Sequence, residues 1–295
     1  MREVEEFIDY LKYQKNYSKY TILNYKKDLN EYQNFLSKNN LSLKKIKYDD
    51  AVKYLKFLNE KKNSKNSISR KLSSLRSFYK YLVLNNKIEK NIFLLVSSPK
   101  KSKKIPKYIN YNDIETIFNV PNIKTKEGQR EKVIIEILYG SGIRVSELIN
   151  IKLSDISFNE KSILIHGKGN KERIVNFGEY AYESLKNYIN DGRIKYLSGI
   201  KSDYLIVGTK KEKLTTRRIE QIIDELINKT STNLNITPHM FRHSFATHLL
   251  DQGCDLLVVQ ELLGHSSLSS TEIYTYVSNE RIREIYRKCH PRNIE

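Results

Sequence analysis

The chain has 295 residues, enough for two domains that each bury a hydrophobic core, and its 52 lysines and arginines against 34 acidic residues leave a net charge of +18. A polyanion, with nucleic acid as the leading candidate, is the expected partner, although an AT-rich genome would also enrich lysine, asparagine, isoleucine and tyrosine. No window of eighteen apolar residues and no signal-peptide core occur, so a cytoplasmic protein without a membrane partner is expected. Cys254 and Cys289 are too few for a disulfide framework.

Residues 1–96 carry four stretches of apolar residues at the three- and four-residue spacing of amphipathic helices. Ser18 is expected to cap the second helix. Asp49 or Asp50 is expected to open the third, and Asn66 the fourth. The four apolar stripes are Val4, Phe7, Ile8 and Leu11; Ile22, Tyr25, Leu29, Tyr32 and Leu36; Val52, Leu55 and Leu58; and Ile68, Leu72, Leu75, Phe78 and Leu82. A helical N-terminal domain is therefore predicted.

The fourth of these helices also has a basic face. The cations placed away from its apolar stripe are Arg70, Lys71, Arg76 and Lys80. This arrangement suits a helix laid against DNA phosphates, and a solvated basic face fits it nearly as well.

A short basic segment follows the helical region. Residues 97–107, SSPKKSKKIPK, combine two prolines with five lysines and a single large apolar residue. This composition predicts an extended interdomain linker that crosses a DNA backbone, with a neutral spacer as the alternative.

A second domain is expected from Tyr108 onward. Asn112 or Asp113 is expected to cap a short helix, and residues 130–139 form a strongly apolar one that ends at a Gly-Ser-Gly loop. In the following stretch, IRVSELINI, Arg144 and Glu147 share a helix face. Glu147 is expected to orient neighbouring cationic side chains, and an ordinary surface ion pair is equally compatible with the sequence.

A β-hairpin is predicted next, because residues 162–166 and 172–177 alternate apolar and polar side chains around the tip sequence GKGNK. The tip is not a nucleotide-binding loop, since the full G-x-x-x-x-G-K-[ST] pattern is absent and strands flank it on both sides. Helical spacing resumes at Gly178, and residues 205–207 are expected to form a short strand before a basic segment at positions 217 and 218.

The stretch from Thr237 to Tyr276 concentrates the candidate chemistry. Thr237 and Pro238 are expected to open a helix, on whose first turn His239 and Arg242 share a face that suits a phosphate. A second helix ends at Gly264, which delivers His265 at a helix end, and Tyr274 follows nine residues later. A tyrosine hydroxyl can attack a phosphodiester directly while Arg and His donors stabilise the developing charge, so no metal is required.

Taken together, these residues resemble the pattern R…K…H-x-x-R…[H/W]…Y of the tyrosine recombinase (phage integrase) family. The matching positions are Arg144 in GSGIRVSEL, Lys168 in HGKGNKER, His239 and Arg242 in TPHMFRHSFATHL, His265 in LLGHSSLSST and Tyr274 in IYTYV. The segments SRKLSSLRSFYKYL and YRKCHPR are similar to those of the bacterial Xer subgroup. Tyr276 departs from the pattern, since many relatives have histidine there.

The resemblance implies a mainly α fold with a small β-sheet. Residues 1–96 would form a four-helix core-binding (SAM-like) domain, residues 97–107 the linker, and residues 108–295 an α+β catalytic domain with a C-terminal exchange tail. The implied activity is cleavage and rejoining of DNA strands through a 3′-phosphotyrosine intermediate, without metal, ATP or other small cofactor.

The resemblance also implies a role for each matching residue. Tyr274 would be the nucleophile, with Tyr276 as its rival. Lys168 would protonate the leaving 5′ oxygen as general acid, with Lys171 as its local rival. The nonbridging oxygens would be bound by Arg144 and Arg242, and hydrogen bonds and proton management would come from His239 and His265.

The implied partners are double-stranded DNA with paired half-sites, a homo- or hetero-tetramer assembled on it, and a DNA translocase as a candidate activator, all in a nucleoid-associated setting. The expected process is resolution of chromosome or plasmid dimers, with mobile-element integration or excision as the alternative. The tail from Ser278 to Glu295 is expected to dock on a neighbouring subunit, and docking within its own subunit is the alternative. A monomer is expected to gain little from it.

Two other classes of protein compete with this interpretation. A zinc enzyme could use His239 and His243 with His248, Cys254 or His265 completing the shell, but no glutamate follows His239 as H-E-x-x-H requires. A non-catalytic DNA-binding regulator would not need a tyrosine nine residues after His265. Cleavage with and without a chelator separates all three classes.

Overall fold

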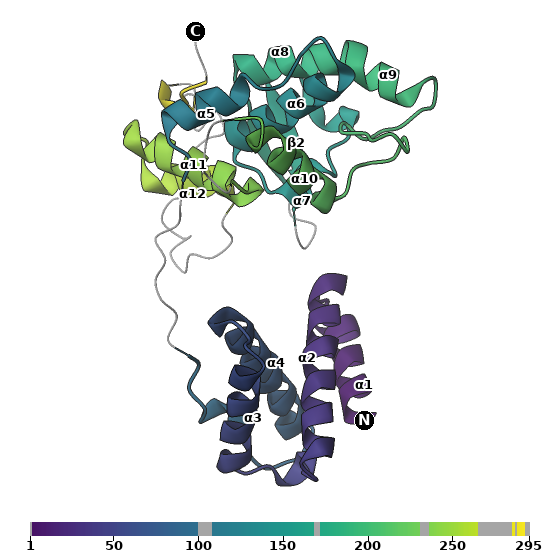
Figure 1. Ribbon diagram of the computed structural model, residues 1–295, viewed down its shortest axis with the longest axis vertical. Helices are drawn as coiled ribbons and strands as arrows, with labels where there is room; N and C mark the ends of the chain where they lie inside the picture. The colour runs from purple at the N-terminus through teal and green to yellow at the C-terminus, as the bar shows by residue number, and fades with distance from the viewer. Residues whose placement is uncertain are drawn as a thin grey trace. The chain divides into compact units, whose positions relative to one another are not determined.

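The computed structural model describes residues 2–99, 108–167, 172–230, 236–264, 285–286 and 288–292. The chain divides into two compact units, residues 1–104 and 105–295, each with its own hydrophobic core (Figure 1). Across these described residues the fold is mainly helical with one small sheet, as predicted. Most of the predicted linker, residues 100–107, lies outside the described residues. Within the described part of the chain, no helix is long and apolar enough to cross a bilayer.

The N-terminal unit is built from helices alone within its described residues. Its elements are α1 (Arg2–Asp9), the π-helical turn η1 (Tyr10–Gln14), α2 (Lys19–Lys38), the 3₁₀ turn η2 (Leu43–Lys45), α3 (Tyr48–Glu60), α4 (Lys65–Leu84) and the 3₁₀ turn η3 (Ile92–Leu94). Aromatic side chains dominate the core, where the Tyr32 and Tyr79 hydroxyls are hydrogen-bonded at 2.7 Å and Tyr54 and Phe78 are fully buried. The predicted four-helix domain is confirmed.

The capping residues confirm one predicted helix start in this unit and correct two others. Ser18 caps α2 as expected, by accepting a hydrogen bond from the Thr21 N–H. The expected start at Asn66 is wrong, because Ser64 caps α4 by accepting from the Ser67 N–H. The expected start of α3 at Asp49 or Asp50 is also late, because the helix begins at Tyr48. Asp50 is its third residue and accepts a hydrogen bond from the backbone N–H of Lys47, the residue before the helix.

The apolar stripe of α3 is rotated relative to the prediction. Val52 is 41% exposed, whereas Ala51 and Tyr54 are buried together with Leu58. The aromatic ring of Tyr54 replaces Val52 in the core because it packs edge-on against Tyr32, with ring centroids 5.0 Å apart.

The basic face predicted for α4 is largely occupied by contacts within the unit. Lys71 is buried and forms an ion pair with Glu31. Arg76 donates to the Phe93 and Val96 carbonyls at 3.0 and 2.6 Å and so fastens the segment that follows the helix. The expectation of an exposed outer position is therefore wrong for Lys71, while Arg76 is half-buried. Lys80 is exposed as expected.

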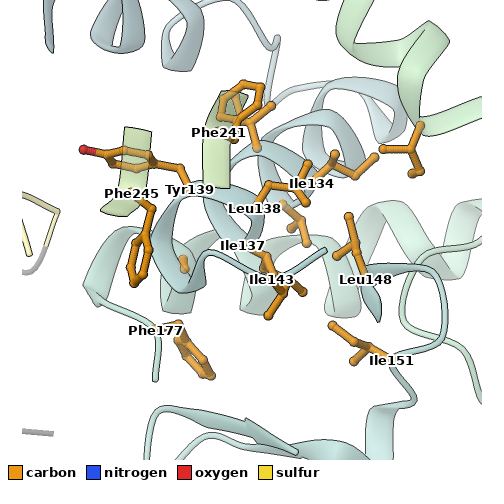
Figure 2. Close-up of a cluster of buried hydrophobic side chains, with 14 of the residues drawn as sticks. Ile134, Ile137, Leu138, Tyr139, Ile143, Leu148, Ile151, Phe177, Phe241 and Phe245 are labelled. Atoms are coloured by element: carbon orange, nitrogen blue, oxygen red, sulfur yellow. The ribbon is translucent and has the colours of Figure 1, made fainter. Parts of the chain in front are cut away.

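The C-terminal unit surrounds one central helix, α6. Its elements are α5 (Tyr111–Phe118), α6 (Lys126–Ser141), α7 (Val145–Leu148), the 3₁₀ turn η4 (Leu153–Asp155), β1 (Ile156–Ser157), β2 (Ser162–His166), β3 (Glu172–Asn176), α8 (Glu179–Asn187), the π-helical turn η5 (Tyr188–Gly192), α9 (Arg193–Leu197), α10 (Thr216–Ile227), α11 (Pro238–Asp251) and α12 (Leu256–Leu263). Nearly every residue of α6 from Gly128 onward is buried. Figure 2 shows Ile137 and Leu138 of α6 in a cluster with Phe241 and Phe245 of α11.

Two boundaries near α6 differ from the prediction. The cap of α5 is Asn110, whose side chain accepts from the Asp113 N–H at 2.8 Å, and neither Asn112 nor Asp113 caps the helix. The helix α6 runs through Gly140 and Ser141, so the expected loop shrinks to Gly142, which ends the helix in a left-handed conformation with φ of 59°.

The three-stranded antiparallel sheet has the order β1-β2-β3. Pairing of Ile163 with Val175 and of His166 with Glu172 confirms the predicted hairpin. Its tip, residues 168–171, lies outside the described residues. The strand expected at residues 205–207 is not formed, because Tyr204 and Val207 make only isolated bridges.

The described part of the tail packs within its own unit. Tyr286 is 2% exposed and its hydroxyl donates to the Gly140 carbonyl at 2.7 Å. His290 is stacked on Tyr286 with ring centroids 4.9 Å apart, and the Arg292 guanidinium binds the buried Glu136 carboxylate, with Nε to Oε2 at 2.9 Å. The expectation that a monomer gains little from its tail is therefore wrong for residues 285–286 and 288–292.

Candidate active site

A single buried carboxylate, that of Glu147, organises the described part of the predicted site. It accepts from the Arg144 backbone N–H at 2.8 Å and from Arg144 Nη1 at 3.0 Å. It also accepts hydrogen bonds from both terminal nitrogens of Arg173, Nη1 and Nη2, at 3.0 and 2.9 Å. Burial alone would raise the pKa of Glu147, but the hydrogen bonds from Arg173 and Arg144 lower that pKa to about 2. The carboxylate is thus fully ionised at neutral pH and orients cations, as the sequence predicted.

Arg144 reaches this position because of the turn that ends α6. Gly142 has a φ of 59°, and a Cβ there would lie 2.4 Å from the Phe245 ring. The turn buries Ile143 and places Arg144 at the N-cap of the short helix α7, one turn before Glu147. The Arg144 side chain stays 41% exposed while one of its nitrogens binds Glu147, so the remaining face of the guanidinium is open to a ligand.

Arg242 is held by the ends of two helices. Its Nη1 donates to the Gly142 carbonyl at 2.6 Å and its Nη2 to the Leu263 carbonyl at 2.7 Å, at the C-termini of α6 and α12. Cations are favoured there, because helix C-termini carry partial negative charge. Burial, and after it the charge of Arg144, lowers the pKa of Arg242 to about 10, which still leaves the group protonated at neutral pH.

His239 lies where the sequence placed it, in the first turn of α11. It follows Pro238 at the start of the helix and is exposed. Backbone N–H groups of a first helical turn have no intrahelical acceptor, so this end of α11 favours an anion. His239 and Arg242 are thus three residues apart on one helix, as predicted, although Arg242 lies just beyond the first turn.

The other predicted site residues are Lys168, His265 and Tyr274, and they lie outside the described residues, as do the rivals Lys171 and Tyr276. The structure does place the residues that lead to two of them. Glu172 and Arg173 continue the hairpin directly after residues 168–171. Gly264, which precedes His265, ends α12 with φ of 64° against the Arg173 side chain.

Arg173 is the residue that the sequence interpretation missed. It shares a strand face with the buried Val175, two positions on, and its side chain is only 18% exposed. A cation on the inward face of a strand requires a buried partner, and that signal could have identified it.

One of the histidines of α11 that the zinc alternative would recruit, His248, belongs to the core. His248 is 1% exposed, its Nδ1 is hydrogen-bonded to the Tyr139 hydroxyl at 2.8 Å, and its ring stacks on Tyr111 at 3.9 Å. In the ranges that the structure covers, no group of three or more His, Cys, Asp or Glu side chains could hold a metal ion.

The sequence matches two family models in chain order. Residues 4–86 match the phage integrase N-terminal SAM-like domain, and residues 107–281 match the phage integrase family. Among curated relatives, tyrosine recombinase XerC of Anoxybacillus flavithermus is 46% identical, over 97% of this chain and 96% of the relative. Tyrosine recombinase XerC of Bacillus subtilis is 45% identical, over 98% and 96%.

Solved structures agree with these matches. XerA recombinase is 30% identical with a TM-score of 0.51, over 99% of this chain and all of that one. XerH site-specific recombinase bound to its difH substrate is 26% identical with a TM-score of 0.68, over 90% of this chain and 78% of that one. A lambda integrase dimer bound to a core site, at 16% identity and a TM-score of 0.68, covers 90% of this chain and 94% of that one and shares the fold.

Proposed function

Since the chain belongs to the phage integrase family, we propose that the arginines gathered around Glu147 bind the scissile phosphate of a DNA strand. The protein is a tyrosine-type enzyme for site-specific DNA recombination of the Xer kind. The proposal concerns which residues carry out that reaction, and it rests chiefly on the geometry of Arg144 and Arg242.

The charge balance of the cluster supports this assignment. Arg144, Arg173 and Arg242 bring three positive charges to one carboxylate, that of Glu147, so two positive charges remain uncompensated within it. A phosphodiester carries one negative charge and gains a second in the pentacoordinate transition state. Preorganised donors that match the developing charge are the main source of catalysis in such reactions. Arg144 and Arg242 are the proposed ligands of the nonbridging oxygens.

The covalent chemistry falls to residues assigned from the motif. The Tyr274 hydroxyl attacks phosphorus, a 3′-phosphotyrosine bond forms, and the bond to the 5′ oxygen breaks. Lys168, from the hairpin tip, protonates that oxygen, while His239 and His265 donate hydrogen bonds and manage the tyrosine proton. Rejoining runs the same steps backwards with a different 5′ hydroxyl, so the phosphotyrosine conserves the bond energy and the reaction needs no external energy source.

The proposed substrate is double-stranded DNA with paired half-sites, bound by a homo- or hetero-tetramer. The XerH relative is bound to its difH substrate, and lambda integrase, which shares the fold, forms a tetramer on a Holliday junction. Resolution of chromosome or plasmid dimers on the nucleoid, with a DNA translocase as activator, is the process we propose. Mobile-element integration would use the same chemistry, and sequencing the DNA bound in the host distinguishes the two.

The arginine assignment is tested by replacing Arg144 or Arg242 with alanine. Loss of one charged donor is expected to cost about 2.7–4 kcal/mol of transition-state stabilisation, or about a hundredfold or more in single-turnover cleavage. Binding of one half-site should change far less, because many other cations contact the DNA backbone. Thermal melts must accompany Arg242→Ala, since that side chain also joins two helix ends. Parallel loss of binding and cleavage in folded variants would show that the assignment is wrong.

The nucleophile is tested separately. On nicked suicide substrates, Tyr274→Phe should bind DNA and form no covalent adduct, whereas Tyr276→Phe should still form the adduct. Residues two apart on a helix point roughly 200° apart, so only one of the two could face the phosphate. The opposite result would transfer the nucleophile to Tyr276, and a wild-type protein without any adduct would instead favour the non-catalytic regulator.

A further inference from the structure

Given the proposed role of Arg144 in binding phosphate, we infer that Arg173 is a positioning residue for catalysis, acting on Arg144 through the shared carboxylate of Glu147. Arg173 donates to both oxygens of Glu147, at 3.0 and 2.9 Å. Arg144 binds the same two oxygens, one through its backbone N–H at 2.8 Å and one through Nη1 at 3.0 Å. The position of Arg144 is therefore set by a carboxylate that Arg173 clamps from the other side.

Arg173 also joins three segments that lie far apart in sequence. It belongs to β3 and follows the hairpin tip that contains Lys168. The carboxylate that it binds, that of Glu147, lies in α7. Its Cδ and Nε lie against Gly264 at the end of α12, so closely that a Cβ added to this glycine would be 2.7 and 2.8 Å from them. The hairpin, the helix of the first phosphate-binding arginine and the turn before His265 thus meet at one side chain.

The geometry requires the guanidinium itself and not only its charge. A planar fork with two parallel N–H donors matches both oxygens of a carboxylate, whereas a lysine ammonium reaches one oxygen at a time. The Glu147 side chain is 6% exposed, so water cannot replace a lost donor at little cost. Without Arg173, the carboxylate would turn fully toward Arg144, neutralise it and draw its guanidinium away from the phosphate.

The consequences can be measured as cleavage rates on preformed complexes. Single-turnover adduct formation at saturating protein should fall about ten- to a hundredfold in Arg173→Gln, because misplacing a catalytic group by about 1 Å has that order of effect. Affinity for one half-site should stay within about threefold, since phosphate contacts elsewhere dominate binding. Arg173→Lys should recover part of the lost rate. Arg218→Gln removes another two-pronged pair, with Glu225 on the exposed face of α10, and is the matched control that should cleave normally.

A double-mutant cycle with Glu147→Gln separates positioning from direct action. If Arg173 acts through Glu147, the two single variants lose similar amounts and the double variant loses no more than either one. If the fold-losses in cleavage rate of the two single variants instead multiply in the double variant, Arg173 acts independently of Glu147, and the inference is overturned. Normal cleavage by Arg173→Gln would also overturn it, because Arg173 would then have no role. Thermal melts show whether Arg173→Gln is folded. If it is not, the same double-mutant cycle is run with Arg173→Lys in place of Arg173→Gln.

Arg144→Ala keeps this test distinct from the test of the proposed function. Normal cleavage by Arg144→Ala would show that the phosphate-binding assignment itself is wrong. A strong loss in Arg144→Ala beside normal cleavage in Arg173→Gln would leave that assignment standing and refute only the positioning role.

Discussion

His290 should make the C-terminal unit sensitive to mild acid. The ring is 4% exposed and packs against Tyr286 and Phe245, with ring centroids 4.9 and 5.5 Å away. Its Nδ1 accepts the Arg292 backbone N–H at 3.2 Å, and among the described residues its Nε2 has no partner. Burial, assisted by the charge of Arg292, lowers the pKa of His290 to about 3.

The sign and size of the effect follow from proton binding. An ordinary histidine in the unfolded chain takes up a proton near pH 6.5, while the folded chain takes up none until about pH 3. The unfolded state therefore binds more protons as the pH falls through 6.5, and the free energy of unfolding decreases by up to about 1.4 kcal/mol per pH unit. Between about pH 7.5 and 5, His290 alone should remove about 2 kcal/mol.

Comparison with His290→Phe isolates this contribution. Phenylalanine keeps an aromatic ring against Tyr286 and does not titrate, and all other ionisable groups are common to both chains. Urea unfolding followed by circular dichroism gives the stability of each protein at about pH 7.5, 6 and 5. The difference between the two proteins should shift by about 2 kcal/mol in favour of the variant as the pH falls. A difference that stays constant over this range would refute a neutral, buried His290.

Two further pairs of substitutions, each a variant with its control, test the packing of Gly142 and of Arg292. Gly142→Ala should lower the free energy of unfolding by about 2–4 kcal/mol. The alanine would have to adopt a left-handed backbone conformation, and its Cβ would also clash with the Phe245 ring of α11. Gly253→Ala, whose φ is 81° with open space around it, should cost only about 1–2 kcal/mol, and equal costs in urea melts would contradict the clash. Arg292→Ala should cost about 3 kcal/mol by leaving the 1% exposed Glu136 without its main partner. Arg218→Ala, which breaks an exposed pair with Glu225, should lower the stability by less than about 1 kcal/mol. Equal losses of stability in the two arginine variants would contradict a strong contribution from the buried pair of Arg292 and Glu136.

Periodicity and cap residues predicted most of the fold because those signals are local. The apolar stripe of α4 from Ile68 to Leu82 is buried throughout, and the alternating residues of β2 and β3 pair as expected. Errors arose where two local signals competed. Both Ser64 and Asn66 can cap a helix, and only the structure shows that Ser64 does so, by accepting a hydrogen bond from the backbone N–H of Ser67.

Long-range pairing could not be read from local patterns. Lys71 and Arg76 lie on the polar side of α4 and were therefore expected to face DNA or solvent. Instead, Lys71 pairs with Glu31, and Arg76 donates to the carbonyls after the helix. In the site, spacing predicted that Arg144 and Glu147 share a helix face. It gave no reason to bring Arg173 to the same carboxylate, because that contact joins a strand to a helix 26 residues away.

Packing of the tail within its own unit does not conflict with exchange between subunits, since every copy of the chain offers the same partners. A tail passed to a neighbouring copy would again find a Gly140 carbonyl and a Glu136 carboxylate, so the exchange would recover the contacts that it breaks. In a hetero-tetramer the same contacts form only if the other chain supplies an acidic group in that place. The pair formed by Arg292 and Glu136 therefore reports on which subunit holds the tail.

Charge reversal turns this argument into a measurement. Arg292→Glu places two acids together, and Glu136→Arg places two bases together, so each variant alone should lose recombination. If tails pass between neighbours, an equimolar mixture restores opposite charges at every junction of an alternating tetramer and should recover recombination. The double variant, with both reversals in one chain, is the control that the reversed pair fits the site. An active double variant beside an inactive mixture would show that each tail stays in its own subunit.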